Sequence, residues 1–195
     1  PVDIKRFNFK NKREDFYLSV NRLVPNKRVD LLINSFNKLN LPLIIIGDGP
    51  ERSKLEKVAK SNIKFLKKVS NFEVENYMSR CRAFVYAGLE DFGIAPIEAM
   101  AAGAPVIGYG KGGILDTVIC FNNANKKNFS NGILFKNQKL SDIVDTISWF
   151  EDKKIWKKFK SQDLHNYSKR FSPEIFETKF DFFINKVWEE FKIKS

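Results

Sequence analysis

The sequence predicts a single α/β domain in which helices cover both faces of a doubly wound parallel sheet of about six strands. Short apolar runs alternate along the chain with segments whose apolar residues recur at helical spacing. Apolar strands that alternate with helices form parallel sheets, and such sheets are covered on both faces. The chain has 195 residues, of which 43% are hydrophobic, so it can form one domain with its own core.

The first half of the chain contains four predicted strands, at residues 16–20, 43–46, 63–66 and 83–87. Apolar residues at helical spacing predict the first helix over residues 29–39. Pro50 fits the first position of a second helix, over residues 51–60. Ser70 and Glu73 form a capping box that opens a third helix.

The second half adds two strands, at residues 105–108 and 133–135. A short helix over residues 96–102 has proline at its start and Gly103 just past its end. Residues 113–119 form another short helix, and the polar, Asn-rich stretch 121–130 is a loop.

Helices follow over residues 142–150 and 152–168, and a last helix begins at Pro173. This last helix carries a wide apolar stripe: Ile175, Phe176, Phe180, Phe183, Ile184, Val187, Trp188 and Phe191. The stripe either packs on this domain or covers something that is absent from the chain.

Rossmann-like sheets of this kind bind ligands just beyond the carboxyl ends of their strands. The loop after the first strand carries Arg22 and Lys27 on either side of Pro25, ahead of a helix N-terminus that favours anions. The two cations can converge on a diphosphate, with ordinary surface charge as the alternative. Residues 47–50, Gly-Asp-Gly-Pro, form a tight turn that lets backbone approach a ligand. They do not match G-x-G-x-x-G, so a dinucleotide cofactor is not indicated.

The loop after the fourth strand gives the strongest signal. Glu90 lies in the loop, Glu98 lies in the first turn of the next helix, and the backbone of residues 93–95 lies between them. One carboxylate can accept hydrogen bonds from two vicinal hydroxyls. Two carboxylates on either side of free N–H groups therefore suit a nucleoside diphosphate sugar. The alternatives are a helix-dipole role for Glu98 and a solvated loop acid at Glu90.

The spacing from Glu90 to Glu98 is the E-x7-E pattern of retaining GT-B glycosyltransferases. Residues 16–150 resemble the donor-binding half of the "group 1" glycosyltransferases (family 4), in the blocks LSVNRLVPNKRVDLLINSF, LIIIGDGP, EDFGIAPIEAMAAGAPVIGYGKGG and NGILF. Gly112 and Gly113 fit the turn of that family's Gly-Gly block. Several spaced motifs in the same order make the resemblance specific.

The resemblance implies a role for each candidate residue. Arg22 and Lys27 would hold the donor diphosphate, and Glu98 would bind the ribose hydroxyls. Glu90 would be the catalytic residue, facing the transferred sugar. Backbone contacts to sugar and phosphate would come from three residues: Phe92, Gly93 and Ile94.

The chain also departs from the family pattern. The base would meet main chain near Val69, but Lys67 and Lys68 replace the usual Gly-Arg-type pair there. Asn21 stands where many members have glycine, and Asp116 where glutamate is common. No D-x-D motif is present, so we expect no metal and no cofactor, only a GDP- or UDP-sugar substrate. The cations would then offset the charge that develops on the leaving diphosphate.

The expected domain organisation follows from the resemblance. Residues 1–15 resemble an interdomain linker, residues 16–150 form the donor-binding domain, and residues 151–195 form C-terminal helices. The last helix is expected to pack toward an N-terminal acceptor domain that is missing here. The chain opens with Pro1, which fits a processed Met-Pro start or excision from a longer protein.

The function that the resemblance implies is transfer of a hexose to a glycan or lipid-linked acceptor in cell-surface polysaccharide or lipopolysaccharide synthesis. Mannose from GDP-mannose is the donor that overall likeness favours. We expect the isolated chain to bind donor without transferring sugar. The alternatives are a GT-B epimerase or phosphorylase domain, which E-x7-E disfavours, and a non-catalytic basic binding module.

Charge and composition indicate which classes of binding partner to expect. The net charge of +11 is spread along the chain, without a stacking motif for bases, so no nucleic acid partner is expected. Residues 153–160, where Trp156 and Phe159 lie among lysines, are either a solvated face or a patch for an anionic membrane surface. Cys81 and Cys120 are expected to be reduced, as in a cytosolic protein, with a single disulfide as the alternative. The expected location is the cytoplasm, with the inner face of the plasma membrane as a peripheral site.

Overall fold

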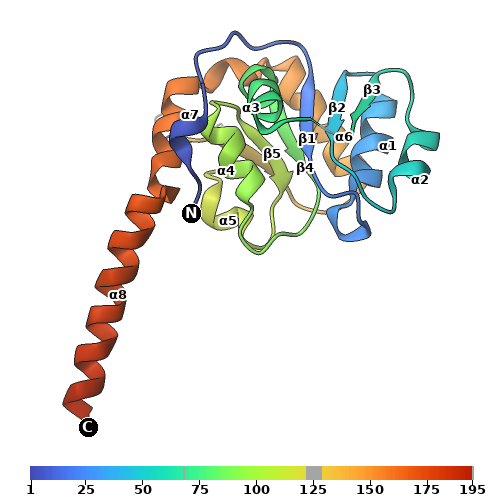
Figure 1. The fold of residues 1–195 in the computed structure, drawn as a ribbon. Helices are drawn as coiled ribbons and strands as arrows, with labels where there is room; N and C mark the ends of the chain where they lie inside the picture. Colours follow the sequence, from blue (N-terminus) through green and yellow to red (C-terminus); the bar gives the residue numbers. More distant parts are fainter. Residues whose placement is uncertain (68, 122–128, 195) are drawn as a thin grey trace.

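The computed structural model describes residues 1–67, 69–121 and 129–194. A parallel sheet of six strands runs through the middle of the domain in the order β3-β2-β1-β4-β5-β6 (Figure 1). Its strands are β1 (Tyr17–Val20), β2 (Leu43–Ile46), β3 (Ile63–Leu66), β4 (Ala83–Tyr86), β5 (Val106–Tyr109) and β6 (Gly132–Phe135). The winding reverses between β1 and β4, which confirms the doubly wound class and places the expected crevice there.

Eight α-helices are described around this sheet. They are α1 (Val29–Leu39), α2 (Arg52–Val58), α3 (Asn71–Arg80), α4 (Ile94–Ala101), α5 (Ile114–Thr117), α6 (Leu140–Asp152), α7 (Ser161–Ser168) and α8 (Pro173–Lys194). Short 3-10 turns lie at Ile4–Arg6, Pro25–Lys27, Ile155–Lys158 and Lys169–Phe171. Helices α1 and α6 pack together on one face, and α4 packs with α3 and α7 on the other.

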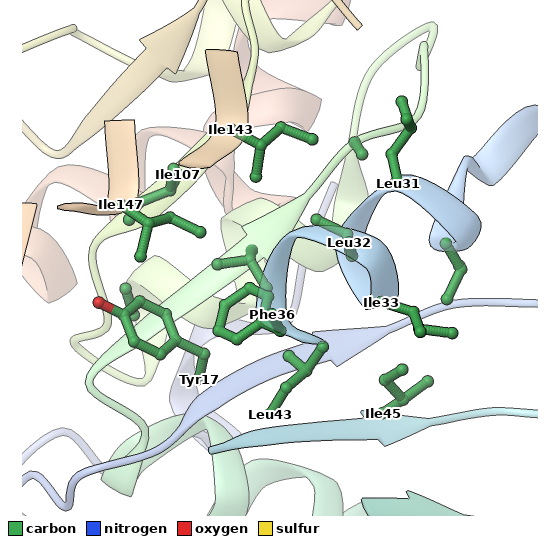
Figure 2. Close-up of a cluster of buried hydrophobic side chains, with 14 of the residues drawn as sticks. Tyr17, Leu31, Leu32, Ile33, Phe36, Leu43, Ile45, Ile107, Ile143 and Ile147 are labelled. Carbon is green, nitrogen blue, oxygen red and sulfur yellow. The ribbon is translucent and has the colours of Figure 1, made fainter. Parts of the chain in front are cut away.

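The core on the first face is built by α1, α6 and the strands beneath them (Figure 2). Phe36 is fully buried, and its ring meets that of Tyr17 edge-on at a centroid distance of 5.1 Å. Ile107, Ile143 and Ile147 lie close by in the same cluster. Since a buried aromatic ring removes a large apolar area from water, this contact helps to fix α1, and with it the loop that precedes α1.

The second core lies under α4. Its residues Ala99, Met100 and Ala101 are fully buried, and the small side chains of the two alanines let the helix lie close to the sheet. Residues 1–15 cover the outside of this core, where Val2 and Phe7 are buried. The segment that resembles a linker is therefore packed against the domain.

Two predicted helix boundaries are wrong for identifiable reasons. Helix α4 begins at Ile94, two residues before the expected start, because Gly93 adopts a φ of +86° and serves as its N-cap. The single helix expected over residues 152–168 is instead a 3-10 turn followed by α7, and Lys154 interrupts it with a left-handed φ of 51°. The capping box of Ser70 and Glu73 is confirmed.

The basic stretch 153–160 turns its apolar side chains inward. Ile155 and Phe159 are buried, and Trp156 is half-buried with Arg82 over its ring. The aromatic residues that suggested a membrane patch are thus part of the core. Among the described residues, no helix has both the length and the apolar character needed to cross a membrane.

Helix α8 extends away from the domain (Figure 1). Its apolar side chains are exposed, Phe182 to 72% and Phe183 to 58%. The alternative in which the stripe packs on this domain is therefore wrong. The expectation that both cysteines are unpaired is confirmed, with Cys81 buried and Cys120 exposed. The Asn-rich loop falls largely on residues 122–128, outside the described residues, as does Lys68.

Candidate active site

A pocket of about 460 Å³ lies at the carboxyl ends of β1 and β4. It brings together six of the eight residues that the sequence singled out: Arg22, Lys27, Glu90, Phe92, Gly93 and Ile94. Glu98 and Val69 do not line it. The residues that do line the pocket come from two loops more than 60 residues apart in the sequence, and they meet because β1 and β4 are neighbours in the sheet.

Two glycines hold the loop after β1 in place. The Leu23 N–H donates to the Asp48 carbonyl over 2.9 Å, so the turn after β2 is hydrogen-bonded to this loop. A Cβ on Gly47 would lie 1.8 Å from the Asn21 carbonyl oxygen, and one on Gly49 would lie 2.3 Å from that of Leu23. The close approach that these glycines allow is thus to the neighbouring loop.

Asn21 is one of the residues at which the chain departs from the expected family pattern. Its side chain is buried and donates to Ser19 Oγ over 2.6 Å, and that hydroxyl donates to the Val85 carbonyl over 2.9 Å. The amide is therefore used to join β1 to β4 beneath the pocket. This contact was not predicted, because the sequence does not show where the side chain points.

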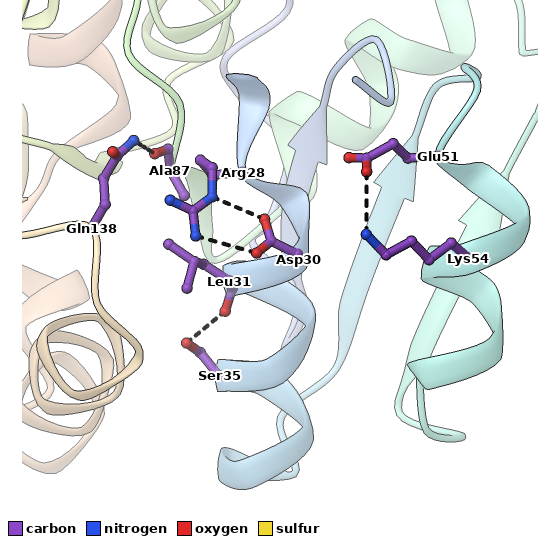
Figure 3. Close-up of polar contacts among 8 residues, drawn as sticks. All are labelled: Arg28, Asp30, Leu31, Ser35, Glu51, Lys54, Ala87 and Gln138. Carbon is purple, nitrogen blue, oxygen red and sulfur yellow. Dashed lines mark hydrogen bonds and ion pairs between the residues drawn. The ribbon is translucent and has the colours of Figure 1, made fainter. Parts of the chain in front are cut away.

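The three basic residues of this loop differ in their partners. Arg22 is exposed, and its side chain has no hydrogen bond or ion pair with any residue that the structure describes. Arg28, with a φ of 50° before α1, is bound to Asp30 through two contacts of 3.2 and 3.3 Å (Figure 3). Lys27 reaches into the pocket and pairs with Glu90. Arg22 is therefore free to bind an added anion, whereas Arg28 is occupied.

Glu90 is the most constrained carboxylate of the pocket. Its Oε1 atom accepts hydrogen bonds from Lys27 Nζ and from the Tyr86 hydroxyl. Its main-chain carbonyl accepts a hydrogen bond of 2.7 Å from the Gly113 N–H. A Cβ on Gly112 would lie 2.5 Å from that carbonyl oxygen, so the predicted Gly-Gly turn supports the loop of Glu90.

The residues between the two carboxylates form the start of α4. Phe92 and Ile94 are exposed, 41% and 55%, and they line the pocket with Gly93. The first N–H groups of a helix have no acceptor within the helix. The pocket thus combines two cations with backbone donors that favour an anion.

Glu98 lies further along α4, half-buried, with Arg6 and Glu75 as its charged surroundings. Burial raises the pKa of its carboxyl group; Arg6 opposes this rise and Glu75 adds to it. Arg6 Nε itself pairs with Glu75 at 2.7 Å. Val69 is half-buried against the core beneath α4. Neither residue is therefore among those that line the pocket with the cations.

Tyr86 is one of the pocket residues that were not predicted from the sequence. It is the last residue of β4 and is only 2% exposed, and its hydroxyl reaches Glu90. A tyrosine at the carboxyl end of a strand, four residues before a candidate acid, was the available signal.

Comparison with known proteins is consistent with this geometry. The family described as "Glycosyl transferases group 1" matches residues 3–171. An uncharacterized glycosyltransferase of Methanocaldococcus jannaschii is 31% identical over 181 residues, which cover 90% of this chain and 48% of that protein. A GDP-mannose-dependent alpha-mannosyltransferase of Corynebacterium glutamicum is 33% identical over 100 residues, which cover 51% of this chain and 24% of that protein. This chain thus spans about half or less of the length of these relatives.

Solved structures show the same fold. Sucrose-phosphate synthase from Thermosynechococcus elongatus superposes with a TM-score of 0.79 at 20% identity, over 97% of this chain and 51% of that one. Anabaena HepE in complex with UDP-glucose superposes with a TM-score of 0.72 at 19% identity, over 92% of this chain and 55% of that one. The chain therefore belongs to the group 1 glycosyltransferases and has the Rossmann-like fold of a GT-B domain.

Proposed function

We propose that the pocket binds a nucleotide sugar and that the chain supplies the donor site of a hexosyltransferase. The observation that carries this proposal is the meeting of Arg22, Lys27 and Glu90 in front of the N-terminus of α4. Two cations and free backbone N–H groups suit a diphosphate, and a carboxylate beside them suits sugar hydroxyls.

Each residue then has a chemical task. Arg22 and Lys27 bind the diphosphate and offset the negative charge that grows on it as the sugar leaves. Glu90 faces the transferred sugar, and Glu98 accepts hydrogen bonds from the ribose hydroxyls. The base lies near Val69. Among the described residues, no three His, Cys, Asp or Glu side chains gather as metal ligands, and metal-free donor binding is part of the proposal.

The relatives support mannose as the sugar. Their names include a GDP-mannose-dependent alpha-mannosyltransferase and the O-antigen chain mannosyltransferase of Salmonella typhimurium. We therefore place GDP-mannose first and a UDP-sugar second, in cytoplasmic synthesis of a cell-surface glycan. Because the chain spans about half or less of the length of its relatives, we propose that transfer needs a second domain, toward which the exposed stripe of α8 would pack.

Isothermal titration of the chain with GDP, UDP and ADP tests the donor site directly. We expect weak binding, with GDP the tightest, and the same affinity in EDTA as in magnesium. Absence of binding for all three would overturn the proposal, and a magnesium requirement would overturn its metal-free part. Sugar transfer by this chain alone would contradict the need for a second domain.

The raised pKa of Glu98 gives a pH prediction. When ionised, its carboxylate can accept from both ribose hydroxyls, whereas protonation turns one oxygen into a donor. GDP affinity should therefore fall on acidification from a pH above the usual Glu value of 4.5. Glu98→Gln should weaken GDP binding about three- to tenfold at pH 7.5 and remove this part of the profile. The nucleotide's own titration is common to both proteins and cancels in the comparison.

The same substitution should not reduce stability. A carboxyl group with a raised pKa holds its proton more tightly in the folded state, so folding stability falls as the pH rises through that range. Glu98→Gln should therefore be at least as stable as the wild type at pH 7.5. A loss of both stability and affinity would indicate a structural role for Glu98.

A further inference from the structure

Lys27, Glu90 and Tyr86 form a three-residue contact inside the pocket. Oε1 of Glu90 accepts from both Lys27 Nζ and the Tyr86 hydroxyl, and Lys27 Nζ lies 6.0 Å from the centre of the Tyr86 ring. The side chains of Lys27 and Glu90 are 22% and 23% exposed, so the pair is largely shielded from solvent. Lys27 is therefore held by Glu90 within the pocket.

A lysine held in this way can bind a diphosphate only at a free-energy cost. To bind phosphate oxygens, Lys27 must loosen its contact with Glu90, which leaves a mostly buried carboxylate with fewer donors. Such a loss is unfavourable, because a shielded charge needs hydrogen-bond partners. Arg22 has no partner to give up among the described residues. The two cations thus differ in what binding demands of them.

We propose that Tyr86 is a positioning residue that keeps Glu90 in place while Lys27 exchanges between Glu90 and the donor diphosphate. This inference rests on the proposed function. The Tyr86 hydroxyl donates to the same oxygen as Lys27, so Glu90 retains a donor and its orientation when Lys27 moves. Because the tyrosine ring is buried at the end of β4, its hydroxyl is fixed from the sheet.

Gly88 is arranged to permit this contact. A Cβ at Gly88 would lie 2.8 Å from the Tyr86 hydroxyl oxygen and 3.1 Å from the Lys27 Cα atom. The backbone of Gly88 is not in the left-handed region, so an alanine would act mainly by displacing these two neighbours. A phenylalanine in place of Tyr86 would still fill the core but would lack the hydroxyl. The Tyr86→Phe variant therefore separates a positioning role of the hydroxyl from a packing role of the ring.

A double-mutant cycle with GDP, or with UDP if only UDP binds, tests the inference on the intact chain. Tyr86→Phe keeps the ring and should weaken nucleotide binding about three- to tenfold. Glu90→Gln removes the charge that holds Lys27 and should strengthen binding. In the Glu90→Gln protein, Tyr86→Phe should change the affinity less than twofold, because no carboxylate is left to support.

A second variant guards against an indirect effect of the first. Gly88→Ala should weaken binding in the wild type and weaken it less in the Glu90→Gln protein, where only the displacement of the Lys27 backbone still acts. Equal effects of Tyr86→Phe in both backgrounds, or no effect in either, would overturn the inference while leaving the donor site intact. Failure of the wild type to bind any nucleoside diphosphate would instead overturn the proposed function.

Discussion

Gly47→Ala should destabilise the protein by roughly 3 kcal/mol or more, with a fall in Tm of about 6–12 °C. Gly47 has a φ of +146°, and its missing Cβ would lie 1.8 Å from the Asn21 carbonyl oxygen. An alanine there is both strained and blocked by backbone, which cannot move aside as a side chain does. The turn after β2 and the loop after β1 must separate, and Arg22 is displaced with that loop.

Urea denaturation and thermal melting measure this loss, and GDP titration measures its effect on the site. Gly93→Ala is the matched control, since Gly93 also has a positive φ, +86°, but the nearest atom to its Cβ would be 3.4 Å away. This control should cost about 1 kcal/mol, from backbone strain alone. Equal losses in the two variants would show that the clash with Asn21 is relieved at little cost.

The sheet was predictable because its strands are short apolar runs between helices. Residues 43–46 and 63–66 match β2 and β3 to the residue. The start of α4 was not predictable, since the positive φ of Gly93 is a property of the fold. The break at Lys154 was missed for the same reason: a left-handed lysine has no sequence signal.

The candidate site shows the same division. Arg22, Lys27 and Glu90 meet because parallel strands end at one edge of the sheet, a rule that can be applied to the sequence. The Tyr86 contact depends on side-chain orientation, and on the space that Gly88 leaves. The spacing placed Glu98 in the helix that follows Glu90, but it could not show that Arg6 and Glu75 are its charged surroundings.

Arg22→Ala should weaken GDP binding about ten- to a hundredfold, as expected for losing charge-assisted hydrogen bonds to phosphate. Its stability should stay within about 0.5 kcal/mol of the wild type, because the Arg22 side chain has no hydrogen bond or ion pair among the described residues. Arg22→Lys should restore only part of the affinity, since lysine lacks the two-pronged grip of a guanidinium.

Arg28→Ala is the control for charge, because it removes one positive charge from the same loop at a residue already paired with Asp30. It should change GDP affinity less than twofold. If calorimetry gave Arg22→Ala the wild-type affinity, Arg22 would not belong to the site. If the two alanine variants weakened binding equally, the loop would attract the nucleotide through net charge, and the pocket geometry would have no part in it. A large loss confined to Arg22 would locate the diphosphate between Arg22 and Lys27, in front of α4.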